Sequence, residues 1–84
     1  MKYQLVLAPK AKKDLDKIDK NFRVRLLQSL ILLQSDPYKG KKLKGEFEGT
    51  FSLRVWPYRI IYELDTRKKV ILVIRIGHRQ GVYQ

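Results

Sequence analysis

The chain has 84 residues and a formal net charge of +11, from 19 lysines and arginines against eight acidic residues. This length supplies one hydrophobic core, so we expect a single domain over residues 1–84. The 44% hydrophobic content excludes an ordinary disordered polycation, and no apolar run approaches the ~20 residues of a membrane span. The absence of cysteine and the single histidine exclude a disulfide framework and a thiolate or multi-histidine metal site. We therefore expect a basic cytoplasmic protein without a signal segment, metal or other cofactor, whose partners are polyanions.

The first part of the chain predicts a strand followed by a helix. Residues 2–7 combine β-branched and aromatic residues with partial alternation, which is typical of a strand. Pro9 suits the first turn of a helix, and Ala11, Leu15 and Ile18 then recur at helical spacing. Lysines and aspartates alternate on the other face of this helix, so we interpret that face as solvated and assign it no function.

A second helix follows after a short link. Asn21 is expected to cap it, and Asp36 ends it because the next residue is proline. Its main apolar stripe consists of Phe22, Leu26, Leu30 and Leu33. A second set of apolar positions, which indicates packing on both a sheet and the neighbouring helix, consists of Val24, Leu27 and Ile31. The short link predicts an antiparallel helical hairpin.

The second half predicts a loop and three consecutive strands. Residues 39–49 contain three glycines and four lysines and are interpreted as an irregular loop. Residues 51–56 and 58–64 alternate, whereas 70–76 is apolar on both faces apart from one arginine and should lie inside the sheet. The predicted fold class is therefore α+β, in two layers of order β-α-α-β-β-β, with the helical hairpin packed on a mainly antiparallel sheet.

The excess positive charge lies mainly in the second half, where residues 39–84 carry eleven basic and four acidic side chains. Arg54 and Arg59 fall on the polar side of two adjacent predicted strands, and Arg75 and Arg79 lie at the end of the last one. We expect these side chains to converge on the sheet face that the helices leave open. Aromatic residues lie among them at Trp56, Tyr58 and Tyr83.

Several guanidinium groups on one open face repel one another unless an anion binds, and their planar forks match phosphate geometry. Aromatic side chains beside them are expected where bases stack next to a charged backbone. The alternative interpretation is a solvated polar face with incidental arginines. For the set as a whole we favour anion binding.

Short motifs in the second half occur in a specific order. Residues 43–62 contain L-K-G, L-R-V and Y-R-I-I-Y, and the chain ends with I-G-H-R followed by V-Y. Together they resemble the RelE/ParE superfamily of bacterial and archaeal toxins. The opening strand, Pro9 and the helical hairpin also match that family's layout, so the resemblance covers essentially the whole chain. It implies a RelE-like fold and a toxin of a type II toxin–antitoxin pair.

In the RelE branch, the resemblance implies a ribosome-dependent endoribonuclease that cuts mRNA in the ribosomal A site and inhibits translation. The expected partners are thus mRNA, the ribosome with its rRNA, and a cognate acidic antitoxin. The family's catalytic arginine in the Y-R strand falls on Arg59. The arginine after the glycine that closes the last strand falls on Arg79, and the C-terminal tyrosine falls on Tyr83. The chain stops just after this tyrosine, without the C-terminal helix of some relatives.

The preceding strand departs from the family pattern at one of its two basic positions. One of these positions falls on Arg54, and the other falls on Ser52, which offers no charge where some members have lysine. Lys42 or Lys44 from the loop is expected to substitute for it, although a lysine-rich loop is also ordinary soluble surface. The residues expected to bind RNA are therefore Lys42, Lys44, Ser52, Trp56 and Arg75.

RNA cleavage without metal requires that the 2′-OH lose a proton, that the phosphorane charge be stabilised and that the 5′-oxygen leave protonated. We expect Arg54 and Arg59 to bind the phosphate, and Arg79 to bind it or protonate the leaving group. Tyr83 is assigned as base or base-stacking residue, since guanidinium groups would lower its reference pKa of about 10. His78 suits either proton transfer and is equally a structural histidine in a strand-end turn. Because an arginine is a poor acid, we expect the leaving-group proton to come from water or from His78.

Two other functions stay open. The first is a ParE-like toxin, which shares the fold and inhibits DNA gyrase without nuclease activity. The second is a nucleic-acid-binding module without activity. The additional apolar residues of the second helix offer an antitoxin docking surface, with hairpin packing as the favoured alternative for Leu27 and Ile31.

Overall fold

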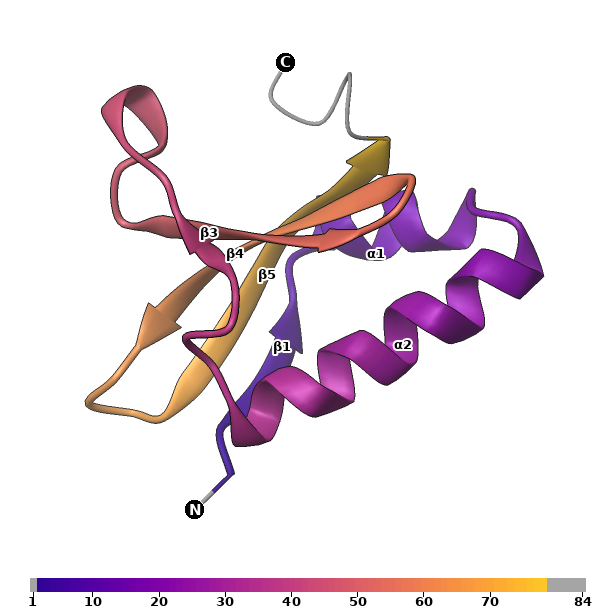
Figure 1. Cartoon of the computed structure of the whole chain (residues 1–84). Coiled ribbons are helices and arrows are strands. Elements are labelled where there is room, and N and C mark those ends of the chain that lie inside the picture. Colours follow the sequence, from indigo (N-terminus) through magenta and orange to yellow (C-terminus); the bar gives the residue numbers. More distant parts are fainter. Residues whose placement is uncertain (1, 79–84) are drawn as a thin grey trace.

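Two helices lie against a five-stranded sheet in the computed structural model, which describes residues 2–78 (Figure 1). A 3₁₀ turn, Gly45–Phe47, lies between the second and third strands. The other elements are β1 (Gln4–Leu7), α1 (Pro9–Asp16), α2 (Lys20–Ser35), β2 (Lys41–Lys42), β3 (Thr50–Val55), β4 (Tyr58–Asp65) and β5 (Val70–His78).

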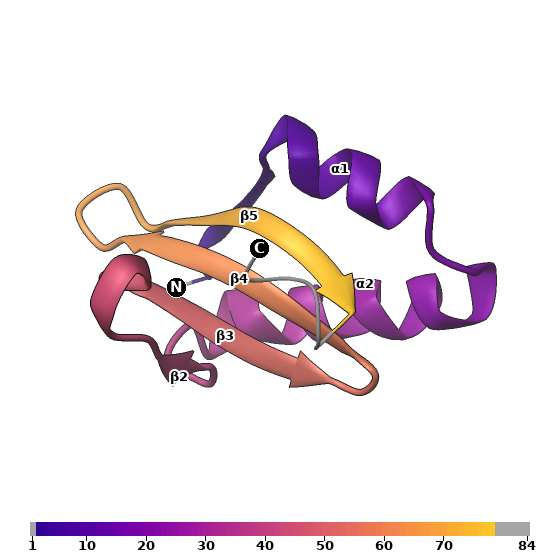
Figure 2. The same ribbon diagram turned by 90° about the horizontal axis from the view of Figure 1, so that it is seen from above.

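The strand order of the sheet is β1-β5-β4-β3-β2. β1 pairs in parallel with β5, and the other neighbours are antiparallel. The predicted α+β fold with helices on a mainly antiparallel sheet is confirmed. So is the interior position of the 70–76 strand, since β5 lies between β1 and β4. Figure 2 shows the three long strands β3, β4 and β5 running side by side, with α1 next to β5.

Strand alternation and the helical stripe together build the core between the two layers. The strands contribute every second residue on the helix side, and α2 contributes residues three and four positions apart. Burial of each such aliphatic side chain stabilises the fold by about 1.5–3 kcal/mol. The fully buried members are Ala11, Leu26, Leu30, Leu33, Ile60, Tyr62, Ile71 and Val73.

Several boundaries differ from the predictions. Asp19, with extended backbone, occupies the position before α2, and Asn21 lies in the first turn, so the cap expected at Asn21 is wrong. α1 ends at Asp16, before the Ile18 of its predicted stripe, and only Lys17, Ile18 and Asp19 separate it from α2. Residues 39–49 are also not wholly irregular, because they contain β2 and the 3₁₀ turn. A two-residue strand is too short to show alternation.

The second apolar stripe of α2 faces solvent. Val24, Leu27 and Ile31 are 49%, 41% and 59% exposed. The favoured prediction that Leu27 and Ile31 pack within the hairpin is therefore wrong. The physical reason is that α1 packs mainly on β5, whereas α2 packs on β1 and β3, so this side of α2 has no neighbour among residues 2–78.

A buried tyrosine holds the segment between α2 and β2 against the sheet. Tyr62, on β4, is fully buried, and its Oη donates a hydrogen bond to the Pro37 carbonyl at 2.8 Å. The same oxygen accepts a bond from the Gly40 N–H at 3.0 Å. Burial raises the pKa of Tyr62, so the hydroxyl stays protonated and able to donate. A Cβ at Gly40 would lie 2.6 Å from this oxygen, which explains the glycine.

Tyr62→Phe tests this bridge. The substitution leaves the Pro37 carbonyl and the Gly40 N–H without their partner, so we expect the free energy of unfolding to fall by about 1–3 kcal/mol. Urea denaturation followed by circular dichroism measures the change. Tyr58→Phe is the matched control, because the Tyr58 hydroxyl has no hydrogen bond among the described residues. Equal losses in the two variants would contradict the assignment.

Candidate functional site

Two arginines lie directly opposite each other on the face of the sheet away from the core. The β3–β4 register pairs Arg54 with Arg59, while their neighbours Leu53 and Ile60 point into the core. Side chains in such a pair start about 4.5–5.5 Å apart at Cβ. Neither guanidinium has an ion pair with any of residues 2–78. Their mutual repulsion therefore favours the binding of an anion between or above them.

The arginine pair forms one side of a groove with a volume of about 390 Å³. The residues that line this groove are Lys39, Gly40, Lys41, Ser52, Leu53, Arg54 and Arg59. We call it the basic groove, because among residues 2–78 four of its lining side chains are cationic and none is acidic. The residues predicted by name to bind RNA did not include Lys39 and Lys41. Their two-residue spacing was the one available signal, and it has meaning only once β2 is known to pair with β3.

The structure brings a different lysine to the groove from those predicted. Lys41 pairs with Ser52, whereas Lys42 pairs with Phe51, whose ring lies in the core. Paired residues share a face, so Lys42 projects to the side opposite Arg54. Lys44 precedes the 3₁₀ turn and does not line the groove. The expectation that Lys42 or Lys44 supplies the charge beside Ser52 is corrected by this register.

Ser52 and Trp56 have contrasting surroundings. Ser52 is 4% exposed and forms part of the groove floor. Trp56 is 60% exposed and lies in the turn between β3, which carries Arg54, and β4, which carries Arg59. The first is thus close to any bound anion, while the second offers an open ring surface outside the groove lining.

His78 does not join the arginine pair. The β4–β5 register pairs it with Tyr58, and the two rings make an edge-to-face contact with centroids 6.2 Å apart. Tyr58 also contacts Phe22 of α2 at 5.6 Å, which places this pair on the helix side of the sheet. Arg59 pairs instead with Gly77. The structure therefore separates the histidine from the groove.

Arg75 is likewise not a free cation on the open face. Its Nε donates to Asp14 Oδ2 at 2.8 Å, and its second nitrogen reaches Oδ1 at 3.4 Å. The Ile76 N–H donates to the same carboxylate at 3.0 Å. This hydrogen-bonded carboxylate raises the pKa of Arg75. The expected convergence of Arg75 with the other arginines is corrected, as is the view of Asp14 as merely solvated. The predicted positions of Arg79 and Tyr83 lie outside the described residues.

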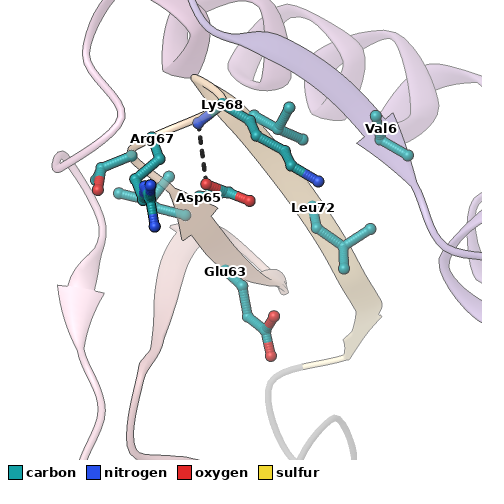
Figure 3. A pocket seen from close by; sticks show the side chains of 9 residues that line it. Val6, Glu63, Asp65, Arg67, Lys68 and Leu72 are labelled. Carbon is teal, nitrogen blue, oxygen red and sulfur yellow. Dashed lines mark hydrogen bonds between the residues drawn. The ribbon is translucent and has the colours of Figure 1, made fainter.

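A second hollow of about 620 Å³ lies at the other end of the sheet, beside the β4–β5 turn (Figure 3). Val6 and Leu72 form an apolar part of its lining, and Glu63 projects beside them. Asp65 Oδ1 accepts a hydrogen bond from the Lys68 N–H at 3.0 Å, which shapes the turn. Its two carboxylates, Glu63 and Asp65, are balanced by Arg67 and Lys68, so this lining has no net charge and the basic groove is the better candidate site for a polyanion.

Residues 2–78 contain neither a metal centre nor a membrane-spanning helix. No three histidine, cysteine, aspartate or glutamate side chains in this range gather closely enough to hold a metal ion. The same range contains no helix that is long and apolar enough to cross a membrane.

Comparison with known proteins identifies the class. The family described as "ParE toxin of type II toxin-antitoxin system, parDE" matches residues 5–83. The chain belongs to this family and thus to the RelE/ParE superfamily of type II toxin–antitoxin toxins. The resemblance seen in the sequence is confirmed.

Individual relatives agree with this assignment. Toxin RelG of Mycobacterium tuberculosis is 29% identical over 86 residues, covering 100% of this chain and 99% of its own. The RelBE2 toxin–antitoxin complex from the same organism contains a chain with a TM-score of 0.89 at 28% identity, covering 94% of this chain and 100% of that one. The archaeal RelE–RelB complex from Pyrococcus horikoshii gives 0.80 at 26% identity, with coverage of 98% and 100%.

Arg54→Gln tests the repulsion within the arginine pair. The substitution keeps most of the stem and removes the charge, so we expect the free energy of unfolding to rise by about 0.2–1 kcal/mol at low salt. The gain should shrink at high salt, because ions screen the repulsion. Urea denaturation at both salt concentrations measures it. Arg67→Gln, in the exposed β4–β5 turn, is the control. The same gain in this variant would indicate only a general effect of net charge.

Proposed function

We propose that this toxin is a metal-independent endoribonuclease that cuts mRNA on the ribosome and thereby inhibits translation. The observation that carries the proposal is the Arg54–Arg59 pair, which lies in a groove whose lining within the described part of the chain has two further cations and no acid. The names of the relatives, Toxin RelG and Toxin RelE, support the same branch of the superfamily. The sequence resemblance implies that the catalytic arginine of that branch falls on Arg59.

The two arginines act on the scissile phosphate. Arg54 and Arg59 bind its oxygens and stabilise the negative charge that grows as the 2′-oxygen attacks. They transfer no protons, because a guanidinium stays protonated above pH 12. In this proposal Arg79 adds a third phosphate contact and Tyr83 acts as base or stacks on a base. The ribosome contributes by orienting the RNA for in-line attack.

His78 takes no part in the proton transfers that we propose. Its ring contacts Tyr58 on the helix side of the sheet, so the sheet itself lies between it and the phosphate site. The leaving oxygen is then protonated by water, because the argument against proton transfer by Arg54 and Arg59 applies to any guanidinium group.

The proposed partner is an acidic antitoxin. Two of the similar structures are complexes of a RelE toxin with its RelB antitoxin. On this chain the exposed apolar stripe of α2, formed by Val24, Leu27 and Ile31, is accompanied by the basic Arg23 and Lys20 on the same helix. An amphipathic acidic helix suits this combination, because its apolar face covers the stripe while its carboxylates meet the cations.

Arg59→Ala tests the nuclease. We expect mRNA cutting in a translation mixture with purified ribosomes to slow by about 10²–10³-fold, which is typical when one charge-stabilising donor is removed. Primer extension on the translated mRNA maps and quantifies the cuts. The control is Arg67→Ala, which removes the same side chain from the distant turn and should cut normally. Unchanged cutting by the Arg59 variant would contradict the proposed site.

A ParE-like inhibitor of DNA gyrase is the second candidate. Two observations favour it: the family model that matches is described as ParE, and Ser52 is uncharged where some RelE members have lysine. A supercoiling assay with purified gyrase separates the two functions. Inhibited supercoiling together with intact translated mRNA would replace the nuclease proposal with this one.

A further inference from the structure

The short strand β2 supplies a cation at the place where β3 has none. Ser52 is 4% exposed and carries no charge, and the register pairs it with Lys41. Paired residues of antiparallel strands project to the same face, so Lys41 stands over Ser52 on the groove side. The next residue, Lys42, is paired with Phe51 and projects to the opposite face.

Lys41 continues the arginine pair into a row of three cations. Arg54 lies two residues beyond Ser52 on β3, which makes Lys41 and Arg54 diagonal neighbours. Diagonal neighbours lie about 7–8 Å apart, within reach of long side chains. Arg54 is in turn directly opposite Arg59. The row therefore crosses β2, β3 and β4, and all three side chains line the basic groove.

The side chain of Tyr62 holds the segment that leads into β2, which carries Lys41. Tyr62 Oη binds the Pro37 carbonyl and the Gly40 N–H, one residue before Lys41. A Cβ at Gly40 would lie 3.1 Å from the Ser52 carbonyl oxygen, which shows how closely this segment approaches β3. The backbone of Lys41 is thus fixed, and only its side chain must be ordered when an anion binds.

We propose that Lys41 binds a backbone phosphate of the RNA next to the one held by Arg54 and Arg59. The inference rests on the proposed nuclease function and adds a substrate-binding residue to that site. The offset of Lys41 from the arginine pair directs it to a neighbouring phosphate, so it contributes to RNA affinity and not to the chemical step. Lys39, which also lines the groove, extends the same path.

The adjacent lysines provide a matched test. Lys41→Ala and Lys42→Ala remove the same charge from neighbouring positions whose side chains project to opposite faces. The probe is a 2′-O-methyl oligoribonucleotide, which lacks the attacking hydroxyl and cannot be cleaved. Fluorescence anisotropy measures its affinity over a range of salt concentrations. We expect Lys41→Ala to weaken binding about tenfold at low salt and to reduce the slope of log K against log salt by about 0.7.

Lys42→Ala should leave the slope unchanged, and Lys41→Arg should restore it because the charge returns. Thermal denaturation of each variant verifies the fold. If the wild type cuts mRNA on ribosomes but the two alanine variants give the same slope, the assignment of Lys41 is overturned and the proposed function stands. If the wild type cuts no translated mRNA, the proposed function itself fails.

Discussion

The buried hydroxyl of Tyr62 is the constraint on which the rest of the structure depends. It lies on β4 at the centre of the sheet, yet its two hydrogen bonds go to the segment that leaves α2. Without these hydrogen bonds, β2 would be held mainly by its pairing with β3, which is weak because β2 is only two residues long. The ring of Tyr62 thus packs in the core, while its oxygen is hydrogen-bonded to Gly40, which lines the groove. Core packing and the position of the groove lysines are therefore coupled.

The long strands and the arginine pair could be predicted from sequence, because both follow from alternation with a period of two. To predict that Arg54 and Arg59 share a face, it is enough to assign the alternating residues correctly on two strands joined by a tight turn. The place of Lys41 could not be predicted in this way, since it depends on the register of a strand too short to alternate. The surroundings of Arg75 and His78 could not be predicted for a related reason. Their surroundings are set by Asp14 of α1 and by Tyr58, which are distant in sequence.

The net charge of +11 is not spread evenly over the open face. At one end the basic groove holds four cations, while at the other Glu63 and Asp65 balance Arg67 and Lys68 beside apolar residues. A uniformly basic face would hold a polyanion in many orientations with similar energy. The charge-balanced end offers a polyanion no net attraction, so a strand of nucleic acid is favoured on the side of β2, β3 and β4.

The hydrogen bond between Asp14 and β5 also affects whether strands of other molecules can pair with the sheet. β1 pairs with β5 only as far as Val73, so the remainder of β5 would present unpaired backbone groups at its edge. Such an edge invites a strand from another molecule to add to the sheet. The Asp14 carboxylate accepts the Ile76 N–H, and α1 lies alongside. The helix therefore covers this part of the β5 edge and hinders the addition of a strand from another molecule, which is a step toward aggregation.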